Sequence, residues 1–293
     1  MRIGIDLGGT KIEGALVDNS GNFVNRQRHP TPREAGYTAI LDQIVSLIRK
    51  LQTQAGRDCS VGVAAPGALD AEGRVKNSNT QCLIGEPLQK DLERRLGRPI
   101  RIENDANCFA LAEALYGAGQ DAPSVFGVIM GTGVGGGIVI QQRLHTGLQH
   151  IAGEWGHNSL DPDGPLCYCG RRGCTETYLS GPGFLADYQR LGGVTALTSE
   201  AVVCEAEAKN PIAEQALNNL LDCFGKALAT VINILDPHVI VLGGGLSNIN
   251  QLYDNGPDRI AKYVFNAVLK TPLRRNVNGD SAGVLGAAGL WDR

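Results

Sequence analysis

The sequence predicts an α/β protein made of two similar halves, and three observations support this prediction. Short apolar strands alternate with amphipathic helices along the chain. The chain has 39 glycines among its 293 residues, and many of them follow short apolar segments. Residues 126–140 can be aligned with residues 3–17 so that three glycines of each segment coincide, namely Gly127, Gly131 and Gly137 with Gly4, Gly8 and Gly14. Two such halves are expected to leave a cleft between them.

The first half is expected to follow the element order βββαβαβα. Residues 2–28 have the pattern of strands joined by short turns, and residues 34–55 have the apolar spacing of a helix. A short buried strand at 59–65 ends at a Pro-Gly pair. The remaining expected elements are a helix at 86–96, a strand at 99–105 and a helix at 106–116.

The second half repeats parts of this pattern. Residues 126–140 read as a glycine-rich hairpin, in the manner of the first two strands. Residues 211–235 form one long amphipathic pattern, which predicts a helix. Residues 238–245 then read as a buried strand that ends in three glycines, as the strand at 59–65 ends in Pro-Gly.

Composition and charge exclude several classes of protein. The formal net charge is −3 and no long run of Lys or Arg occurs, which argues against a nucleic-acid or membrane-surface partner. No stretch approaches the roughly 18 apolar residues of a membrane span, and the N-terminus lacks a signal-peptide pattern. Eight cysteines are too sparse for a disulfide scaffold, so we expect a cytoplasmic protein. Five of them are expected to be small buried thiols: Cys59, Cys82, Cys108, Cys204 and Cys223.

Two glycine-rich turns are candidates for phosphate binding. Backbone N–H groups of such turns can surround phosphate oxygens, although a plain hairpin would also explain paired glycines. Asp6, just before the first turn, favours the phosphate interpretation, because a carboxylate there would need a cation such as Mg²⁺. The candidate residues are Asp6, Gly8, Gly9, Thr10 and Lys11 in the first turn, and Gly131, Thr132 and Gly133 in the second.

The second turn also matches GxGxxG, the fingerprint of dinucleotide-binding proteins. That fingerprint must open a helix, whereas strand-forming residues follow here, so we predict a hairpin. Further along, Gly243 and Gly244 end a predicted strand. They are candidates for nucleotide contact, and tight packing of the backbone is an equally good explanation.

Asn104 and Asp105 are the candidate catalytic pair. They stand where a buried strand ends and a helix begins, which is where ligands bind in α/β sheets. A helix cap would explain one of them, but two adjacent polar side chains exceed what a cap requires. Asp105 could accept a proton from a hydroxyl group while Asn104 holds a neighbouring one.

A cluster of metal-ligand residues lies in the segment 152–176. One imidazole and three thiolates are a standard closed set for structural zinc, supplied here by His157, Cys167, Cys169 and Cys174. The rival interpretation is redox pairing, but a disulfide between Cys167 and Cys169 would be strained and would leave a third thiol over. Zinc is therefore favoured, with the role of shaping a loop that carries Glu154 and Glu176.

These motifs together resemble the ROK family of sugar kinases, and within it the bacterial fructokinase and mannokinase enzymes. The matching segments extend from GIDLGGTK through ENDAN, GTGVGGG, GEWGH and CYCGRRGCTE to IVLGGG. The resemblance covers essentially the whole chain. It implies an actin-like (ribonuclease H-like) duplicated fold, with ATP and sugar in the cleft. The expected domains are residues 1–117 with a C-terminal helix at 281–293, and residues 118–280.

The resemblance also implies roles for individual residues. It implies Asp105 as the general base, phosphate contacts at the two glycine-rich turns, and zinc on the four residues of the cluster. A homodimer is also expected. The sugar-binding residues that it implies are Asn104, Glu154, His157 and Glu176, with Gly67 and Asn79 as further candidates.

The expected reaction is transfer of the γ-phosphoryl group of ATP, with Mg²⁺, to a hexose hydroxyl, most simply O6. Fructose is the expected sugar, with mannose or glucose also accepted. The alternatives are an amino-sugar kinase acting on N-acetylglucosamine and a non-catalytic sugar sensor. A zinc hydrolase is excluded because the four-ligand set leaves no open position on the metal.

Overall fold

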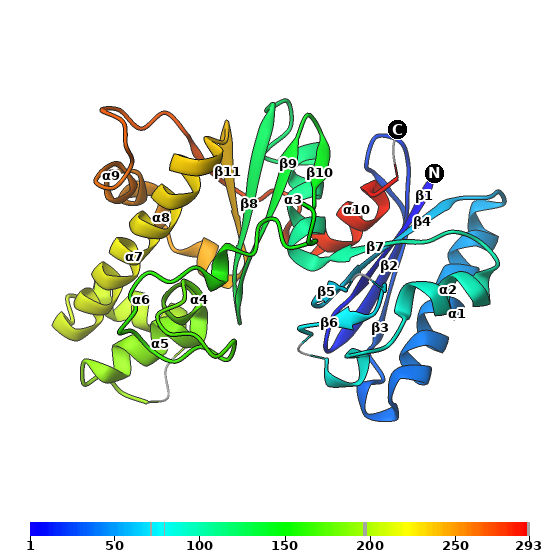
Figure 1. The fold of residues 1–293 in the computed structure, drawn as a ribbon, viewed down its shortest axis with the longest axis horizontal. Helices are drawn as coiled ribbons and strands as arrows, with labels where there is room; N and C mark the ends of the chain where they lie inside the picture. The colour runs from blue at the N-terminus through cyan, green and yellow to red at the C-terminus, as the bar shows by residue number, and fades with distance from the viewer. Residues whose placement is uncertain (71, 79, 196–197, 292–293) are drawn as a thin grey trace. The chain divides into compact units, whose positions relative to one another are not determined.

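The computed structural model describes residues 1–70, 72–78, 80–195 and 198–291, which form two compact units (Figure 1). The first unit contains Met1–Pro123, Gly137–Ala152 and Val277–Arg293, and the second contains Ser124–Gly136 and Gly153–Asn276. This division differs from the expected ranges, because residues 137–152 belong to the first unit. Gly137 lies so close to the first-unit helix at 105–116 that an added Cβ would come within 2.9 Å of the Ala106 carbonyl oxygen.

The first unit is built on a five-stranded sheet with the strand order β3-β2-β1-β4-β7. β1 is antiparallel to β2 and parallel to β4, and β4 is parallel to β7. A separate two-stranded sheet pairs β5 with β6. The strands are β1 Arg2–Leu7, β2 Lys11–Val17, β3 Phe23–Pro30, β4 Ser60–Ala65, β5 Ala68–Leu69, β6 Val75–Lys76 and β7 Arg101–Asn104.

Four helices accompany this sheet: α1 Tyr37–Ala55, α2 Leu88–Leu96, α3 Asp105–Tyr116 and α10 Ala282–Gly289. Short 3₁₀ turns occur at Arg33–Ala35, Gln81–Leu83 and Gly279–Ser281. α1 was predicted from residue 34 but begins at Tyr37, because Gly36 has a φ of 85° that an α-helix does not adopt. Its end at Ala55 agrees with the prediction, and Gly56 caps it in the left-handed conformation.

Alternating residues decide which face of the first sheet receives which helix. Ile3 and Ile5 of β1 pack into one core with residues of α1 and α2. Gly4 points to the other face, where an added Cβ would collide with the Val284 carbonyl of α10. Its β4 partner Gly62 likewise faces the Ala287 carbonyl. The glycines therefore let α10 approach the sheet more closely than any larger side chain would allow.

The second sheet has the strand order β10-β9-β8-β11-β12, which repeats the order of the first. β11 is parallel to both β8 and β12, as β4 is to β1 and β7. The predicted duplicated α/β fold is therefore confirmed. The strands are β8 Ser124–Met130, β9 Val134–Ile140, β10 Arg143–His145, β11 Val239–Gly243 and β12 Leu273–Arg275.

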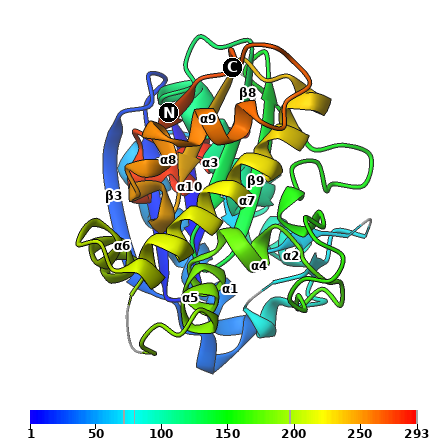
Figure 2. The same ribbon diagram turned by 90° about the vertical axis from the view of Figure 1, so that its left-hand side faces the viewer.

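The long helix α7, Pro211–Leu235, has the predicted bounds. Asn210 caps it by accepting a hydrogen bond from the Ile212 backbone N–H at 3.0 Å, and Pro211 occupies its first turn. In Figure 2 it passes beside the helices labelled α8 and α9. The second unit also contains 3₁₀ turns at Trp155–His157 and Gly245–Asn248. Its other helices are α4 Glu176–Leu179, α5 Gly181–Arg190, α6 Ser199–Glu207, α8 Gln251–Asp254 and α9 Gly256–Ala261.

Among the residues that the structure describes, no helix is both long and apolar enough to cross a membrane. Cys59 and Cys108 are buried as expected, and Cys82 and Cys223 are half-buried. Cys204 on α6 is exposed, so the expectation of a buried thiol is wrong there.

Candidate functional site

The first glycine-rich turn joins β1 to β2. The Gly8 N–H donates to the Lys11 carbonyl at 2.9 Å, and the Thr31 hydroxyl donates to the Gly8 carbonyl at 2.7 Å. Thr10 accepts a backbone hydrogen bond from Thr31 at 3.0 Å, and Thr10 itself is exposed. An added Cβ on Gly9 would have only one neighbour within 4 Å, at 3.8 Å, among the described residues. The turn is thus held from one side and open over Gly9, as a phosphate site would require.

Asp6 stands at the end of β1, before this turn. Burial raises the pKa of Asp6 from its usual 3.8 to about 7, and the nearby charges of Asp105 and Glu13 act in the same direction. Lys11 and Arg28 lower it in part. Glu13 is itself buried and is paired with Arg28 at 2.6 Å. Asp6 therefore requires a proton or a cation, which fits the expected position near Mg²⁺.

Asn104 and Asp105 lie at the junction of β7 and α3. Asn104 is the N-cap of α3, and its side-chain oxygen accepts from the Asn107 backbone N–H at 2.7 Å. The cap role that the sequence left open is therefore filled by Asn104. Its Oδ1 is used in this way, which leaves its NH₂ group as the part that can donate to a ligand.

Asp105 is the first residue of α3. One carboxylate oxygen, Oδ1, accepts from the backbone N–H of Ala106 at 2.9 Å. Burial raises the pKa of Asp105 above its usual range, so its carboxylate is a stronger base than an exposed aspartate. These properties suit a general base.

Gly67 lies between β4 and β5 with a φ of 88°. An added Cβ there would collide with the Lys76 carbonyl and lie 3.0 Å from the Ser78 backbone. A glycine is needed so that this loop can fold against β6. The other predicted sugar residue of this region, Asn79, lies outside the described residues.

In the second unit, the turn Gly131–Gly133 joins β8 to β9. The Gly131 N–H donates to the Gly133 carbonyl at 2.9 Å, and Thr132 at the tip is exposed. The strand β9 follows directly, so the prediction of a hairpin in place of a dinucleotide fingerprint is confirmed. Gly131 has open space where a Cβ would lie, among the residues that the structure describes.

Glu176 reaches this turn from α4. Its Oε2 accepts from the Val134 backbone N–H at 2.9 Å, and an added Cβ on Gly133 would lie 2.7 Å from the same oxygen. The half-buried carboxylate that was predicted to bind sugar is thus in contact with the predicted phosphate turn. The sequence separates these residues by more than 40 positions.

Trp155 provides a second link between the cysteine-rich loop, residues 152–176, and β9. Its indole N–H donates to the Gly135 carbonyl at 3.0 Å, and its ring meets Phe126 of β8 edge to face at 5.7 Å. Glu154, the predicted sugar ligand beside it, is half-buried and forms the N-cap position of the 3₁₀ turn Trp155–His157. The loop is therefore anchored to the start of β9 at two places.

The four predicted metal ligands come together in the structure. Their ligand atoms all lie within 4.8 Å of one another. Two pairs of these atoms, Cys169 Sγ with Cys174 Sγ and Cys167 Sγ with His157 Nδ1, are each separated by 3.6 Å. A tetrahedral zinc ion with Zn–S bonds of about 2.3 Å separates two ligand atoms by roughly 3.6–3.8 Å. The donor set and its spacing therefore fit zinc.

The orientation of His157 supports this assignment. Because Nδ1 faces the sulfurs, Nε2 is left to donate to the Tyr168 hydroxyl at 3.1 Å. Although burial acts in the opposite direction, hydrogen bonds from Arg171 lower the pKa of Cys169 to about 6, which favours the thiolate. Both nitrogens of His157 are engaged, so a sugar contact by this residue would have to replace Tyr168.

The glycines at the end of β11 have a packing role. Gly243 is the buried last residue of the strand, and Gly244 has a φ of 80°. An added Cβ on Gly244 would collide with the Met130 backbone, at the end of β8. Of the two explanations that the sequence left open, this geometry supports tight packing for Gly244.

Two side chains of these sites were not predicted. Tyr168 contacts His157, and its position between two of the cysteines was the only signal. Asn107 was not among the predicted site residues either, and its side-chain NH₂ group donates to Glu103 Oε2 at 3.1 Å.

Comparisons with known proteins agree with the sequence resemblance. Residues 2–293 match the model of the ROK family. The chain is 39% identical to an N-acetyl-D-glucosamine kinase of Vibrio atlanticus and 40% identical to one of Photobacterium profundum, each with 99% of both chains covered.

Two solved structures are also similar. A ROK hexokinase from Thermus thermophilus has a TM-score of 0.89 at 32% identity, covering 99% of this chain and 97% of that one. A ROK family glucokinase from Streptomyces griseus, in complex with glucose and AMPPNP, has a TM-score of 0.80 at 29% identity, covering 99% and 98%. Family, sequence and fold thus agree over the full length, and the chain belongs to the ROK family of sugar kinases.

Proposed function

We propose that this chain transfers the γ-phosphoryl group of ATP to the O6 hydroxyl of N-acetylglucosamine. The observation that carries the choice of sugar is the similarity, at 37–40% identity over 99% of the chain, to several N-acetylglucosamine kinases. The sequence favoured fructose and kept the amino sugar as the alternative, and these relatives support the alternative. Similarity to a hexokinase and a glucokinase supports glucose as a second substrate.

Asp105 and Asn104 are assigned to the reacting end of the sugar. With a raised pKa, Asp105 accepts the proton of the attacking hydroxyl as the bond to phosphorus forms. The Asn104 NH₂ group donates to a neighbouring hydroxyl, since its oxygen is already used to cap α3. Both groups stand at the start of α3, so the backbone holds them in a fixed relation to each other.

The glycine-rich turns are assigned to the nucleotide. The backbone N–H groups of the two turns are proposed to surround the phosphates, with Lys11 adding positive charge to the first turn. When bound with ATP, Mg²⁺ neutralises charge that develops on the phosphates. Asp6 would hold the ion or its waters, and the nearby cation would favour the ionised carboxylate despite its raised pKa.

The cysteine-rich loop is assigned a structural role toward the sugar. Glu154 and Glu176 are the proposed ligands of sugar hydroxyls, and His157 orients the loop between them. Zinc on the four-residue cluster would hold the loop in shape without entering the reaction, because protein atoms fill its coordination sphere.

We also propose that the protein forms a homodimer. Light scattering of the purified protein would test this proposal.

A sugar panel tests the proposal directly. Release of ADP is measured with Mg-ATP and N-acetylglucosamine, glucose, mannose or fructose, and kcat/KM is compared. We expect the highest value for N-acetylglucosamine and no reaction with its 6-deoxy analogue. A highest value for fructose would overturn the choice of sugar and leave the family assignment intact.

A further inference from the structure

A cavity of about 540 Å³ lies along β7, the last strand of the first sheet, and we call it the β7 cavity. Its other walls come from α2, α3, the β9–β10 turn, β10 and the chain at the end of α10, all within the first unit. Its volume is in the range of small-molecule sites, roughly 300–1,000 Å³. Among the described residues, none that is assigned above to ATP, sugar, Mg²⁺ or zinc lines it. The β7 cavity is therefore a site without an assigned ligand.

The floor of the β7 cavity is apolar. Ile102 of β7 and Leu111 and Leu115 of α3 are buried residues that line it. Trp291, beyond the end of α10, lines it as well. The indole N–H of Trp291 donates to the Val61 carbonyl at 2.7 Å, which fixes the plane of the ring. A ligand with a ring can bury apolar surface against such a floor.

Two arginines make the lining of the β7 cavity positively charged. Arg101 and Arg143 both line it, against the single carboxylate of Glu103. Arg101 is held in place, because its guanidinium donates to the Leu290 carbonyl and lies 4.6 Å from the centre of the Trp291 ring. Arg143 is exposed, and its side chain has no ion pair or hydrogen bond with any residue that the structure describes. Guanidinium groups in this number suit a phosphate group, which they bind through charge-assisted hydrogen bonds.

The β9–β10 turn supplies amide groups to the same cavity. Gln141 and Gln142 form this two-residue turn, and both line the cavity. Their φ values are 50° and 62°, in the left-handed region where such turns favour Asn and Gly. Backbone strain of this kind is typical of places where a particular side chain is needed. Gln89 of α2 adds a third amide, and amides can bond the hydroxyl groups or ring nitrogens of a ligand.

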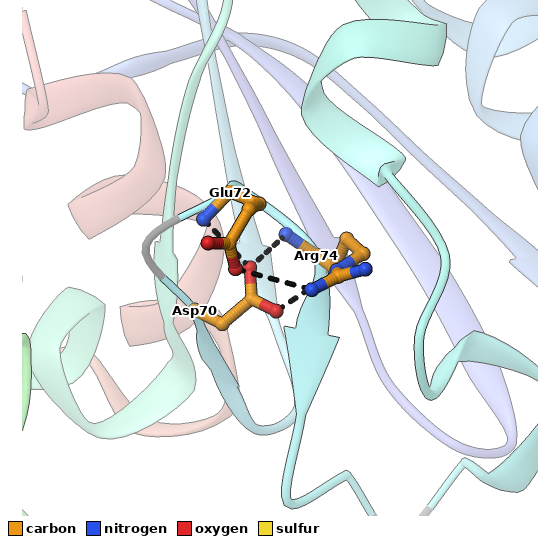
Figure 3. A network of polar contacts seen from close by, with 3 residues as sticks. All are labelled: Asp70, Glu72 and Arg74. Atoms are coloured by element: carbon orange, nitrogen blue, oxygen red, sulfur yellow. Dashed lines mark hydrogen bonds and ion pairs between the residues drawn. The ribbon is translucent and has the colours of Figure 1, made fainter.

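A smaller cavity of about 230 Å³ adjoins the β7 cavity and is lined by Gly67 and Asn104, which are assigned to the sugar. Three residues line both cavities: Gln89, Ile102 and Glu103. Among the described residues, no arginine or lysine lines the smaller cavity. Arg74, next to it in the chain, is already paired with Asp70 and Glu72 (Figure 3). A phosphate group is therefore assigned to the β7 cavity and not to its neighbour.

We propose that the β7 cavity binds a phosphate monoester carried on a ring, with the phosphate at Arg101 and Arg143 and the ring against the apolar floor. Hexose 6-phosphates and nucleoside monophosphates share this chemistry. A neutral sugar or nucleoside lacks the charge that the arginines need, and free phosphate lacks a ring for the floor. The inference goes beyond the proposed function, because it adds a second ligand site and does not depend on which sugar is phosphorylated.

Tryptophan fluorescence of the unmodified protein is the first test. The chain contains two tryptophans, of which Trp291 lines the β7 cavity and Trp155 belongs to the second unit. The probes are N-acetylglucosamine 6-phosphate and AMP, compared with N-acetylglucosamine, adenosine and inorganic phosphate. We expect a saturable change with at least one monoester that is lost in Trp291→Phe, and weaker binding of the three parts. The monoester that binds more tightly identifies the source of the ligand.

Two results of this titration would overturn the proposal. One is the absence of a Trp291-dependent change with either monoester at millimolar concentration. The other is a Trp291-dependent change with N-acetylglucosamine or adenosine at the same affinity as with its phosphate.

Arg143→Ala is the second test, with Arg57→Ala as a matched control. Both arginines are exposed, and Arg57 lies outside the lining of the cavity. Loss of a charge-assisted hydrogen bond should raise the Kd of the tighter monoester about 10- to 100-fold in Arg143→Ala alone. Arg143→Gln replaces it if the alanine variant does not fold. An equal Kd in the Arg143 and Arg57 variants would place the ligand elsewhere and overturn the proposal. Neither readout depends on activity, so a failure here leaves the proposed function intact.

Discussion

Substitution of Gly133 by alanine should separate Glu176 from the turn that it holds. An added Cβ at Gly133 would lie 2.7 Å from Glu176 Oε2, which accepts from the Val134 N–H at 2.9 Å. The carboxylate must move, and a hydrogen bond to a charged group is worth about 1.5–3 kcal/mol. Because Glu176 is half-buried and its carboxylate is the end of a flexible side chain, we expect a loss at or below the lower end of this range, about 1–2 kcal/mol of unfolding free energy.

Gly131 in the same turn provides the matched control. Neither glycine has a positive φ, and an added Cβ at Gly131 meets open space among the described residues. Gly131→Ala should therefore change stability by less than about 0.5 kcal/mol. It should raise KM for ATP if the turn binds phosphate. Gly133→Ala should raise KM for both ATP and sugar, since Glu176 is shared between the two.

A double-mutant cycle measures the contact itself. Unfolding by urea gives the free energy of unfolding for Gly133→Ala, Glu176→Ala and the double variant. In the absence of the Glu176 carboxylate, the cost of Gly133→Ala should fall below about 0.5 kcal/mol. An equal cost in both backgrounds, or an equal cost at Gly131, would refute the reasoning.

Three further predictions concern the base, the metal and the pH. Asp105→Asn should lower kcat by about 10²–10⁴-fold with a melting temperature no lower than that of the parent, and near-normal turnover would remove Asp105 from the mechanism. Cys169→Ser, or a chelator, should release zinc and lower the melting temperature; metal analysis that finds no zinc in protein purified without chelators would contradict this. The pKa of Asp6 is about 7 when folded and near 3.8 when unfolded, so the folded state binds the proton more tightly and stability is lost as pH rises between about 4 and 7. Asp6→Asn should therefore gain stability relative to the parent from pH 5 to pH 7, by at most about 3 kcal/mol, and a constant difference in melting temperature across that range would disprove it.

Local sequence patterns determined the main elements and the residue types of the site. The bounds of α7 follow from a capping Asn210, Pro211 and an unbroken apolar face, all read within one segment. The junction of β7 and α3 placed Asn104 and Asp105 together because they are neighbours in the chain. The three cysteines and His157 lie within 18 residues of one another, so their chemistry alone predicted a common metal site, and the structure brings their ligand atoms together.

Contacts between distant segments were decided by the tertiary structure alone. Glu176 reaches the Gly131–Gly133 turn, and residues 137–152 join the first unit, through packing that no local pattern encodes. The pKa of Asp6 depends on burial and on Asp105, about 100 residues away. A cavity lined by Gly67 and Asn104 is bounded by several separate segments of the first unit. Burial and the electric field at a side chain are sums over all neighbours in space, and a sequence pattern reports only the neighbours along the chain.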